Sequence, residues 1–151
     1  IMILLMLVGG SPGSTAGGMK TTTLAVLLAT MLAVFKRRPN AHIFGRRIPD
    51  DTAHYAATVL FMYLMLFLSG GIFIGYVENI PLISALFEAA SAIGTVGLSL
   101  IGTPNLGAAS RIVLIVLMFL GRVGGMTIVY AALSRKHPYV SELPQEKIMV
   151  G

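Results

Sequence analysis

The sequence contains no cysteine and no tryptophan, and it has few charged residues. Without cysteine, the chain can form no disulfide bond, no thiolate metal site and no thiol redox centre. Charged residues make up only 11% of the 151 positions, against about 25% in soluble domains, while 56% of the residues are hydrophobic. This balance excludes an ordinary soluble domain and indicates an integral membrane protein, in which tyrosine and phenylalanine are left to anchor the interfaces.

The formal net charge of +5 would also suit a nucleic-acid partner. The basic residues, however, lie in the segments that flank apolar runs, in residues 36–52 and again just after residue 133. Basic flanks of this kind mark the cytoplasmic side of membrane segments. We therefore expect no nucleic-acid partner, a multi-pass protein of the plasma membrane surrounded by lipid, and a cytoplasmic basic loop (36–52) and C-terminal tail (134–151).

Apolar segments predict the membrane crossings of an all-α fold. Residues 55–76 and 109–133 are each long enough to cross a hydrocarbon core of about 30 Å as helices. Residues 1–35 read as a further crossing that is broken at residues 9–20, where five glycines and a proline cannot hold a regular helix. Because the apolar run at residue 1 begins abruptly, we expect it to be the end of a helix that starts upstream.

The glycine-rich segment 9–20 admits more than one interpretation. Inside a membrane, such a break must be buried in protein or line a wet cavity, and interrupted helices often hold ion sites and moving parts. A surface linker between two elements would have the same composition. A phosphate-binding loop is excluded, because Lys20 comes one residue too late after Gly18 for that motif and no strand precedes Gly13.

The stretch from Pro81 to Ser99 lies between two crossings and organises the rest of the chain. Residues 81–93 repeat apolar side chains at helical spacing, but a helix of this length reaches only about 20 Å and would stop in mid-membrane. Its carbonyl end, with roughly half a negative charge, would face a cation. The alternative is the buried helix and turn of a soluble protein, which the two flanking crossings disfavour.

Residues 94–99 follow this short helix and predict an ion-selectivity filter. A glycine such as Gly97 can adopt backbone angles closed to other residues, so that successive carbonyl oxygens line one path. In K⁺ channels such carbonyl rings replace the hydration shell of the ion, in a segment that reads TVGYG. Here the segment reads TVGLS. We therefore expect a shorter filter, formed by Thr95, Val96, Gly97 and Leu98, that binds K⁺ at the backbone carbonyls of the first three.

Two charged residues fall inside apolar segments. Arg122 lies about halfway along residues 109–133, where a charge costs at least ~2.5 kcal/mol unless it faces water or a partner. We expect Arg122 to face the pore below the filter, as a positive barrier that Lys20 and the broken segment help to shape; snorkelling to an interface is the alternative. Glu88, within the short helix, either bonds backbone behind the filter, which we favour, or faces water at the outer rim.

No arrangement of residues indicates an enzyme. The three histidines, at positions 42, 54 and 137, lie in or near the inner loops without the spacing of metal ligands. No nucleophile lies beside a base and an orienting group. We expect no cofactor, with K⁺ as the transported ion and Na⁺ as a second candidate.

Three motifs, in this order, resemble the Trk/Ktr/HKT superfamily of potassium transporters: GGSPGSTAGGMKTTT at 9–23, AIGTVGLS at 92–99 and FLGRVGGMT at 119–127. The similarity covers essentially the whole chain and is closest to the bacterial Ktr membrane subunits (KtrB). Members of that superfamily contain four covalently joined helix–pore-loop–helix repeats with a K⁺-channel-like fold. The resemblance implies that residues 1–35 are the second helix of the third repeat and that residues 53–133 are the complete fourth repeat.

The resemblance also implies roles for individual residues and partners. Gly97 would be the filter glycine, and residues 9–20 would be an intramembrane loop that gates the pore beneath the filter, beside a pore arginine. The gating residues would then be Gly10, Gly13, Ser14, Thr15, Gly17, Gly18, Lys20 and Arg122. The implied partners are the rest of the four-repeat membrane subunit, a second copy in a homodimer, and a cytosolic nucleotide-binding regulatory ring (KtrA-like).

The sequence thus predicts potassium uptake across the plasma membrane through a channel-like filter gated by an intramembrane loop, with Na⁺ dependence or leak left open. One alternative is a secondary cation transporter with alternating access, in which the broken helix is the substrate site. The other is a purely structural membrane subunit.

Overall fold

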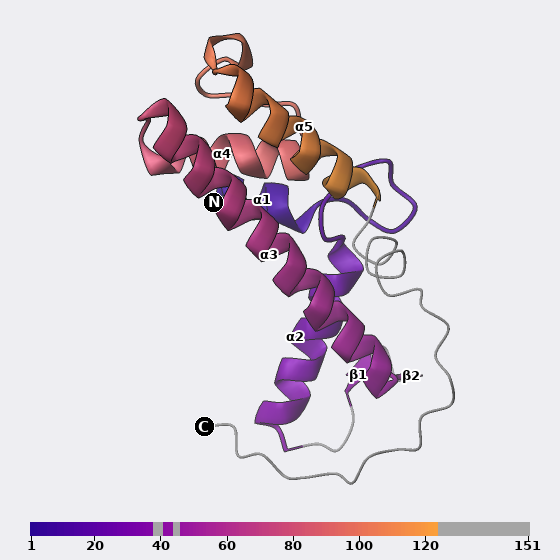
Figure 1. Ribbon diagram of the computed structural model, residues 1–151. Coiled ribbons are helices and arrows are strands. Elements are labelled where there is room, and N and C mark those ends of the chain that lie inside the picture. The colour runs from indigo at the N-terminus through magenta and orange to yellow at the C-terminus, as the bar shows by residue number, and fades with distance from the viewer. Residues whose placement is uncertain (38–40, 44–45, 124–151) are drawn as a thin grey trace, which may run out of the picture.

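The structure is a computed structural model that describes residues 1–37, 41–43 and 46–123. Within these ranges it is helical apart from one antiparallel hairpin of two short strands, β1 (His42–Ile43) and β2 (Arg46–Arg47). The α-helices of this part are α1 (Met2–Val8), α2 (Thr21–Phe35), α3 (Asp50–Glu78), α4 (Leu82–Ile93) and α5 (Ala108–Val123), and a 3₁₀ turn lies at Thr103–Asn105 (Figure 1).

The longest of these elements is α3, whose 29 residues extend about 43 Å. Of the described helices, it is the one whose length and apolar composition suffice to cross a membrane, over residues 51–78. Two glycines let it approach its neighbours closely. A Cβ at Gly70 would lie 2.7 Å from Leu117 Cδ1 on α5, and a Cβ at Gly71 would lie 2.5 Å from Leu86 Cδ2 on α4.

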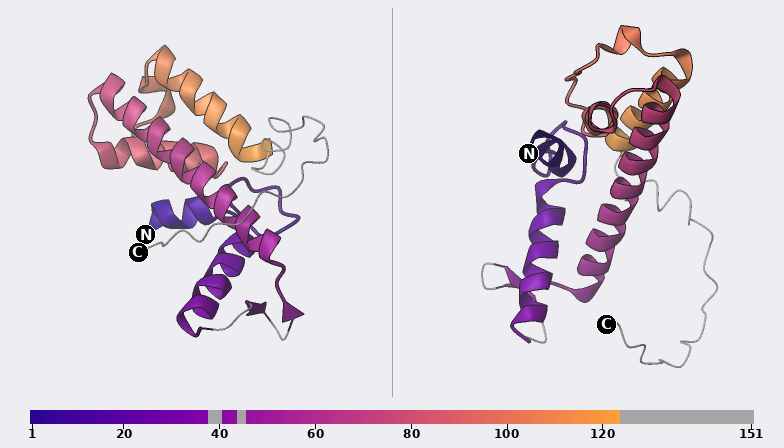
Figure 2. Two further views of the ribbon diagram at one scale, coloured as in Figure 1. Left: turned by 60° about the horizontal axis from the view of Figure 1, so that its bottom comes forward. Right: turned by 90° about the vertical axis from the view of Figure 1, so that its left-hand side faces the viewer.

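The short helix α4 forms the centre of the fold. It packs between α3 and α5, and α1 lies along it; the right-hand view of Figure 2 looks down both α1 and α4. Its buried face is made largely of small side chains, which lets these neighbours come close: Ala85, Ala89, Ala90 and Ala92. Protein therefore surrounds the 12 residues of α4 on several sides.

The helices α1 and α2 do not share one axis. The break expected at residues 9–20 is present, but it turns the chain so that α1 runs beside α4 while α2 runs beside the first part of α3 (Figures 1 and 2). The turn follows from the backbone of this segment, in which Gly9, Gly13, Gly18 and Lys20 all have positive φ. The two helical pieces of residues 1–35 are therefore not collinear, and the assignment of these residues to one broken membrane crossing stays a prediction.

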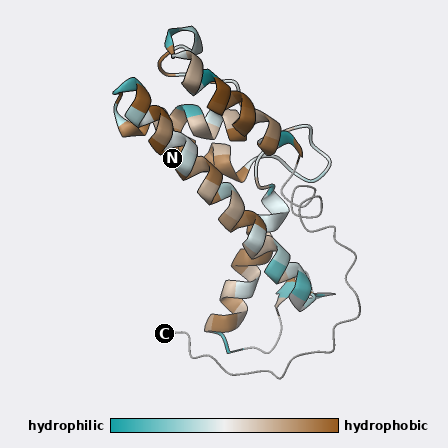
Figure 3. Ribbon diagram, in the orientation of Figure 1, coloured by the Kyte–Doolittle hydropathy of each residue, from teal (hydrophilic) through white to brown (hydrophobic). Residues whose placement is uncertain are grey.

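Much of the outer surface is apolar. Figure 3 shows hydrophobic residues along α2, α3 and α5, and hydrophilic residues at the hairpin end and in the loop before α5. More than half of the surface of several large side chains is exposed, among them Phe61, Ile72, Ile115 and Phe119. Exposed apolar faces of this extent are unfavourable in water, but lipid or further membrane helices can cover them.

Two boundaries differ from those that the sequence predicts. Helix α3 begins at Asp50, inside the segment 36–52 expected to be a loop, because Pro49 holds an extended backbone immediately before the first helical turn. Pro81 is the N-cap of α4 and not its first helical residue. Two predicted segments, the end of the last crossing (124–133) and the tail (134–151), lie outside the described residues.

Candidate functional site

The carboxyl end of α4 is closed by a Schellman motif. The amide of Thr95 donates to the carbonyl of Ala92 at 3.1 Å, and the amide of Val96 donates to the carbonyl of Ser91 at 2.9 Å. Thr95 takes the left-handed conformation that this motif requires, with a φ of 53°. Glycine usually occupies this position, because a β-branched residue is strained there. The end of the helix therefore contains a residue that the local backbone does not favour.

Beyond the helix, residues 95–98 run out of the core, and one side of this segment is not covered by the described part of the chain. Gly97 has a φ of 82°, and a Cβ at this position would meet nothing within 4 Å. Val96 and Leu98 are 43% and 47% exposed. In the described part of the chain, no N–H or O–H group donates to the carbonyl oxygens of residues 95–97. These three successive acceptors are free to bind a cation or groups elsewhere in a larger protein.

The glycine-rich segment has an exposed tip and a buried stem. Residues 11–15 are exposed, and residues 17–19 are buried. In the tip, the hydroxyl of Ser14 accepts a hydrogen bond from the amide two residues further on. The two ends of the segment are tied together, because Thr21 N donates to Gly10 O at 3.1 Å. The segment is therefore a folded unit and not an extended surface linker.

The stem of this loop lies directly against the end of α4. The amide of Gly17 donates to Thr95 Oγ1 at 2.8 Å. A Cβ at Gly17 would lie 2.8 Å from Thr95 Cγ2 and 3.0 Å from the carbonyl oxygen of Ile93. Gly94 is equally confined, since its Cβ would lie 2.6 Å from the carbonyl oxygen of Met6 near the end of α1. The absence of side chains thus permits the contact between the loop and the segment after α4.

Helix α5 joins the same junction near the end of its described part. The carbonyl of Gly121 accepts hydrogen bonds from Gly18 N at 3.4 Å and from the hydroxyl of Tyr63 at 3.2 Å. A Cβ at Gly121 would collide with the carbonyl oxygen of Ile93. Arg122 follows and is exposed on the described part of the molecule. A positive charge is therefore attached one residue from the point where the loop, α4 and α5 meet.

Glu88 supports the other end of the open segment. Its side chain is only 3% exposed, and Oε1 accepts bonds from Ser99 Oγ at 2.7 Å, from Leu100 N at 2.8 Å and from Ile101 N at 3.3 Å. The carboxylate thus fixes the chain just after residue 98. The interpretation in which Glu88 bonds backbone behind the segment is confirmed, and the alternative in which it faces water at the rim is wrong.

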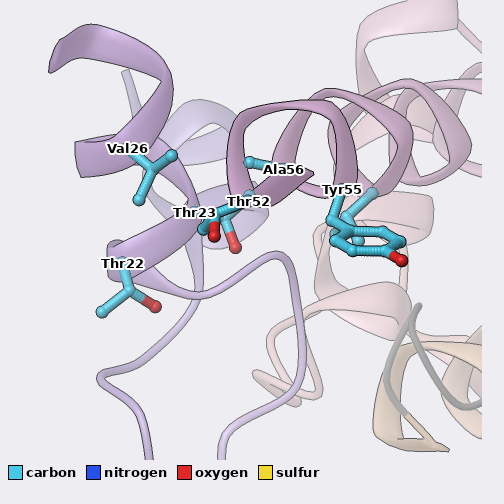
Figure 4. Close-up of a pocket in the computed structure, with 7 residues that line it drawn as sticks. Thr22, Thr23, Val26, Thr52, Tyr55 and Ala56 are labelled. Carbon is cyan, nitrogen blue, oxygen red and sulfur yellow. The ribbon is translucent and has the colours of Figure 1, made fainter. Parts of the chain in front are cut away.

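A separate cavity of about 250 Å³ lies between α2 and the start of α3. Figure 4 shows Thr23 on α2 and Thr52 on α3 facing this hollow, and none of the residues that line it is charged. Among the described residues, no three His, Asp or Glu side chains gather to hold a metal ion. The carbonyl oxygens that follow α4 are therefore the best candidate cation ligands in the part of the chain that the structure describes.

The amino-acid sequence that forms this site is similar to known proteins. Residues 1–142 match the TrkH family, described as cation transport protein. The chain belongs to the TrkH family. The resemblance to Trk and Ktr transporters is thereby confirmed, as are the expectations of a helical membrane protein and of a family of transporters and not of enzymes.

Relatives of this TrkH chain carry names that refer to ion uptake. "Potassium/sodium uptake protein NtpJ" of Enterococcus hirae is 41% identical over 157 residues, which cover 100% of this chain and 35% of the relative. "Ktr system potassium uptake protein B" of Bacillus subtilis is 36% identical and is matched over 85% of this chain and 29% of its own length. The protein of the same name from Vibrio alginolyticus is 28% identical, over 100% of this chain and 33% of its own. The chain thus spans about a third of the length of these relatives.

The structure brings some of the predicted gating residues of this TrkH chain together and leaves others apart. Gly17 and Gly18 contact the end of α4 and Gly121, whereas residues 13–15 lie in the exposed tip. Lys20 is partly buried and precedes α2 with a φ of 70°. The roles of these residues in selecting and gating ions stay predictions.

Sequence reasoning missed three side-chain contacts in this region. The side chain of Thr95 bonds an amide 78 positions away, which no local pattern signals. Tyr63 lies in the middle of a predicted crossing, where its hydroxyl needed a partner. Glu78, at the end of α3, accepts bonds from Gly107 N and Ser110 Oγ and so holds the start of α5. A carboxylate at the end of a crossing and a tyrosine within one were signals that could have been used.

We predict that Glu88→Ala destabilises the protein, while Glu88→Gln stays closer to the parent. Alanine leaves two backbone amides without their acceptor, and each lost bond costs about 1–3 kcal/mol. Glutamine keeps an oxygen acceptor in the same place. The measurement is the thermal transition of the whole purified protein in detergent. Equal transition temperatures for Glu88→Ala and the parent protein would show that the carboxylate does not stabilise this segment.

We also predict that Gly121→Ala destabilises the protein by about 1–3 kcal/mol, because the new methyl group has to displace the backbone at Ile93. Gly75→Ala is the matched control, since a Cβ there would have no contact closer than 3.5 Å. Thermal transitions of both variants, measured as for Glu88, test this. A Gly121→Ala protein as stable as Gly75→Ala would contradict the close approach of α5 to α4.

Proposed function

We propose that the chain is part of a potassium uptake protein, in which residues 95–98 form one wall of a selectivity filter. The observation that carries this proposal is the open segment after α4, with three successive carbonyl oxygens that no described group occupies. The preceding 12 residues of helix direct their carbonyl end toward this segment, which favours a cation there. Backbone carbonyls are the ligands that replace the hydration shell of K⁺ in known filters.

The shape of the segment supports this role. Gly97 holds a positive φ with open space around it, so the chain can turn its carbonyl groups without a side chain in the way. Glu88 fixes the far end of the segment, and the Schellman motif fixes the near end. Preorganised acceptors are what a filter needs, because they do not have to move when the ion loses its water.

A gate beneath the filter is the second part of the proposal. The stem of the glycine-rich loop lies against the end of α4, and Arg122 is attached beside it. In a pore, the loop would obstruct the path and the positive charge would oppose a cation. K⁺ would then pass down its electrochemical gradient when the loop moves aside, with Na⁺ as a competing or coupled ion.

The rest of the proposed protein lies beyond this chain. One filter segment cannot enclose a pore, so further helix–pore-loop–helix repeats would supply the other walls, and the exposed apolar faces of α3 and α5 would contact them or lipid. Two relatives are named as parts of a Ktr system, which agrees with a further, KtrA-like subunit. We extend the proposal to a homodimer that sits on a ring of such subunits. The basic hairpin would face the cytoplasm and that ring.

We predict that Gly97→Ser weakens the preference for K⁺ over Na⁺. A side chain strains a φ of 82° and disturbs the carbonyl groups on both sides. Gly102→Ser is the matched control, because that glycine has a φ of 80° but lies outside the filter. Uptake of K⁺ and Na⁺ by the whole protein in K⁺-transport-deficient cells measures the effect. Unchanged K⁺ preference in a well-expressed Gly97→Ser protein would favour a structural membrane subunit.

We predict that Arg122→Ala raises the rate of K⁺ uptake, because it removes a positive barrier from the pore. Arg111→Ala is the control at the other end of the same helix, where the guanidinium Nε bonds Leu106 O. Deletion of residues 13–18 should raise uptake in the same direction. Initial rates of uptake into proteoliposomes, normalised to the amount of inserted protein, test the gate. Rates at the parent level for both the substitution and the deletion would rule it out.

A further inference from the structure

We propose that the hydroxyl group of Thr95 is a latch that holds the glycine-rich loop against the filter and so sets how often the pore is open. This inference rests on the proposed function and adds a positioning residue to it. The direct observation is the hydrogen bond of 2.8 Å from Gly17 N to Thr95 Oγ1, which joins the loop to the first residue of the filter.

The residue type at position 95 supports a side-chain role. The Schellman motif needs a left-handed residue here, and glycine or asparagine would adopt that conformation with less strain than threonine. Strained residues persist where the surrounding structure holds them, and they gather at functional sites. In this junction, the group that threonine adds beyond a glycine backbone is the hydroxyl that Gly17 contacts, together with a methyl group packed on Gly17.

The bond also lies at the right place to control the loop. The stem's bonds to other helices, from Gly18 N to Gly121 O and from Met19 N to Leu7 O, are 3.4 and 3.3 Å long and therefore weaker. The tip of the loop is exposed and bonded only within itself in the described part of the chain. Releasing the hydroxyl would therefore free the stem from α4 while the ends of the loop stay tied at Gly10 and Thr21.

The coupling follows in both directions. When the side chain of Thr95, the first residue of the filter, changes its position, the glycine-rich loop is released. When the loop moves away first, the side chain of Thr95 is free to move. Loss of one such bond shifts an equilibrium between attached and released loop by about fivefold. This size is enough to change the rate of uptake without abolishing the filter, because the carbonyl groups of residues 95–97 are not part of the bond.

The experiment compares Thr95→Val, which keeps the branched shape but removes the acceptor, with Thr95→Ser, which keeps the acceptor. Thr58→Val is the matched control, because that hydroxyl bonds only His54 O within α3. Two measurements use the whole protein: amide hydrogen exchange of residues 9–20 in lipid nanodiscs, and K⁺ and Na⁺ uptake into proteoliposomes. We expect about fivefold faster exchange and uptake for Thr95→Val with the K⁺ preference kept, and parent-like values for Thr95→Ser and Thr58→Val.

Other results would overturn the latch. Thr95→Val with parent-like exchange but an altered K⁺ preference would mean that the hydroxyl serves the ion and not the loop. Equal effects of valine and serine would show that the fit of the whole threonine side chain, and not its hydroxyl group, holds the loop. A parent protein that takes up no K⁺ would refute the proposed function instead, and the exchange measurement would still decide whether Thr95 holds the loop.

Discussion

Backbone that is not helical must find hydrogen-bond partners inside the protein when it lies at membrane depth, and the rest of this structure depends on how that requirement is met. Two irregular segments, residues 9–20 and 94–102, lie against each other beside the carboxyl end of α4. Groups from several elements accept hydrogen bonds from their amides, among them carbonyls of the last turn of α4, the buried carboxylate of Glu88 and the hydroxyl of Thr95. The bond from Gly17 N to Thr95 Oγ1 and the packing around it therefore tie the two segments to each other.

The second requirement is that the loop and α5 come close to the end of α4, and a glycine on each of them makes this possible. Gly17 reaches the Ile93 carbonyl from the loop, and Gly121 reaches it from α5; a Cβ at either position would crowd or strike that oxygen. Gly94 meets the end of α1 in the same small volume. Gly17 and Gly18 are buried in this contact, and a hydrogen bond is stronger in such surroundings than in water. A substitution at one of these glycines therefore disturbs the packing of the loop, α4 and α5 together.

The sequence predicts the elements well and their junction poorly. Helical spacing and the flanking proline locate α4 within one residue, and five glycines with one proline locate the break before α2, because both signals are local. The turn of α1 away from α2, the left-handed Thr95 and its bond to Gly17 depend on contacts between segments almost eighty residues apart. Glu88 is an intermediate case: its place within the short helix favours a bond to backbone, but its three donors follow from the path of residues 99–101.

The same requirement for hydrogen-bond partners explains why the carbonyl oxygens of residues 95–97, which have no donor, indicate a binding site. Around the end of α4, the amides of residues 94–96 and 100–102 and the carboxylate of Glu88 are paired within the described chain, yet the acceptors of residues 95–97 are not. Acceptors at membrane depth without donors are unfavourable unless a cation, water or another segment binds them. The adjacent carbonyl end of α4 adds negative potential at the same place, which favours a cation over a second acceptor. The free carbonyl oxygens and the negative potential around them therefore both favour a cation. The hydrogen-bonded groups on either side keep these oxygens in position.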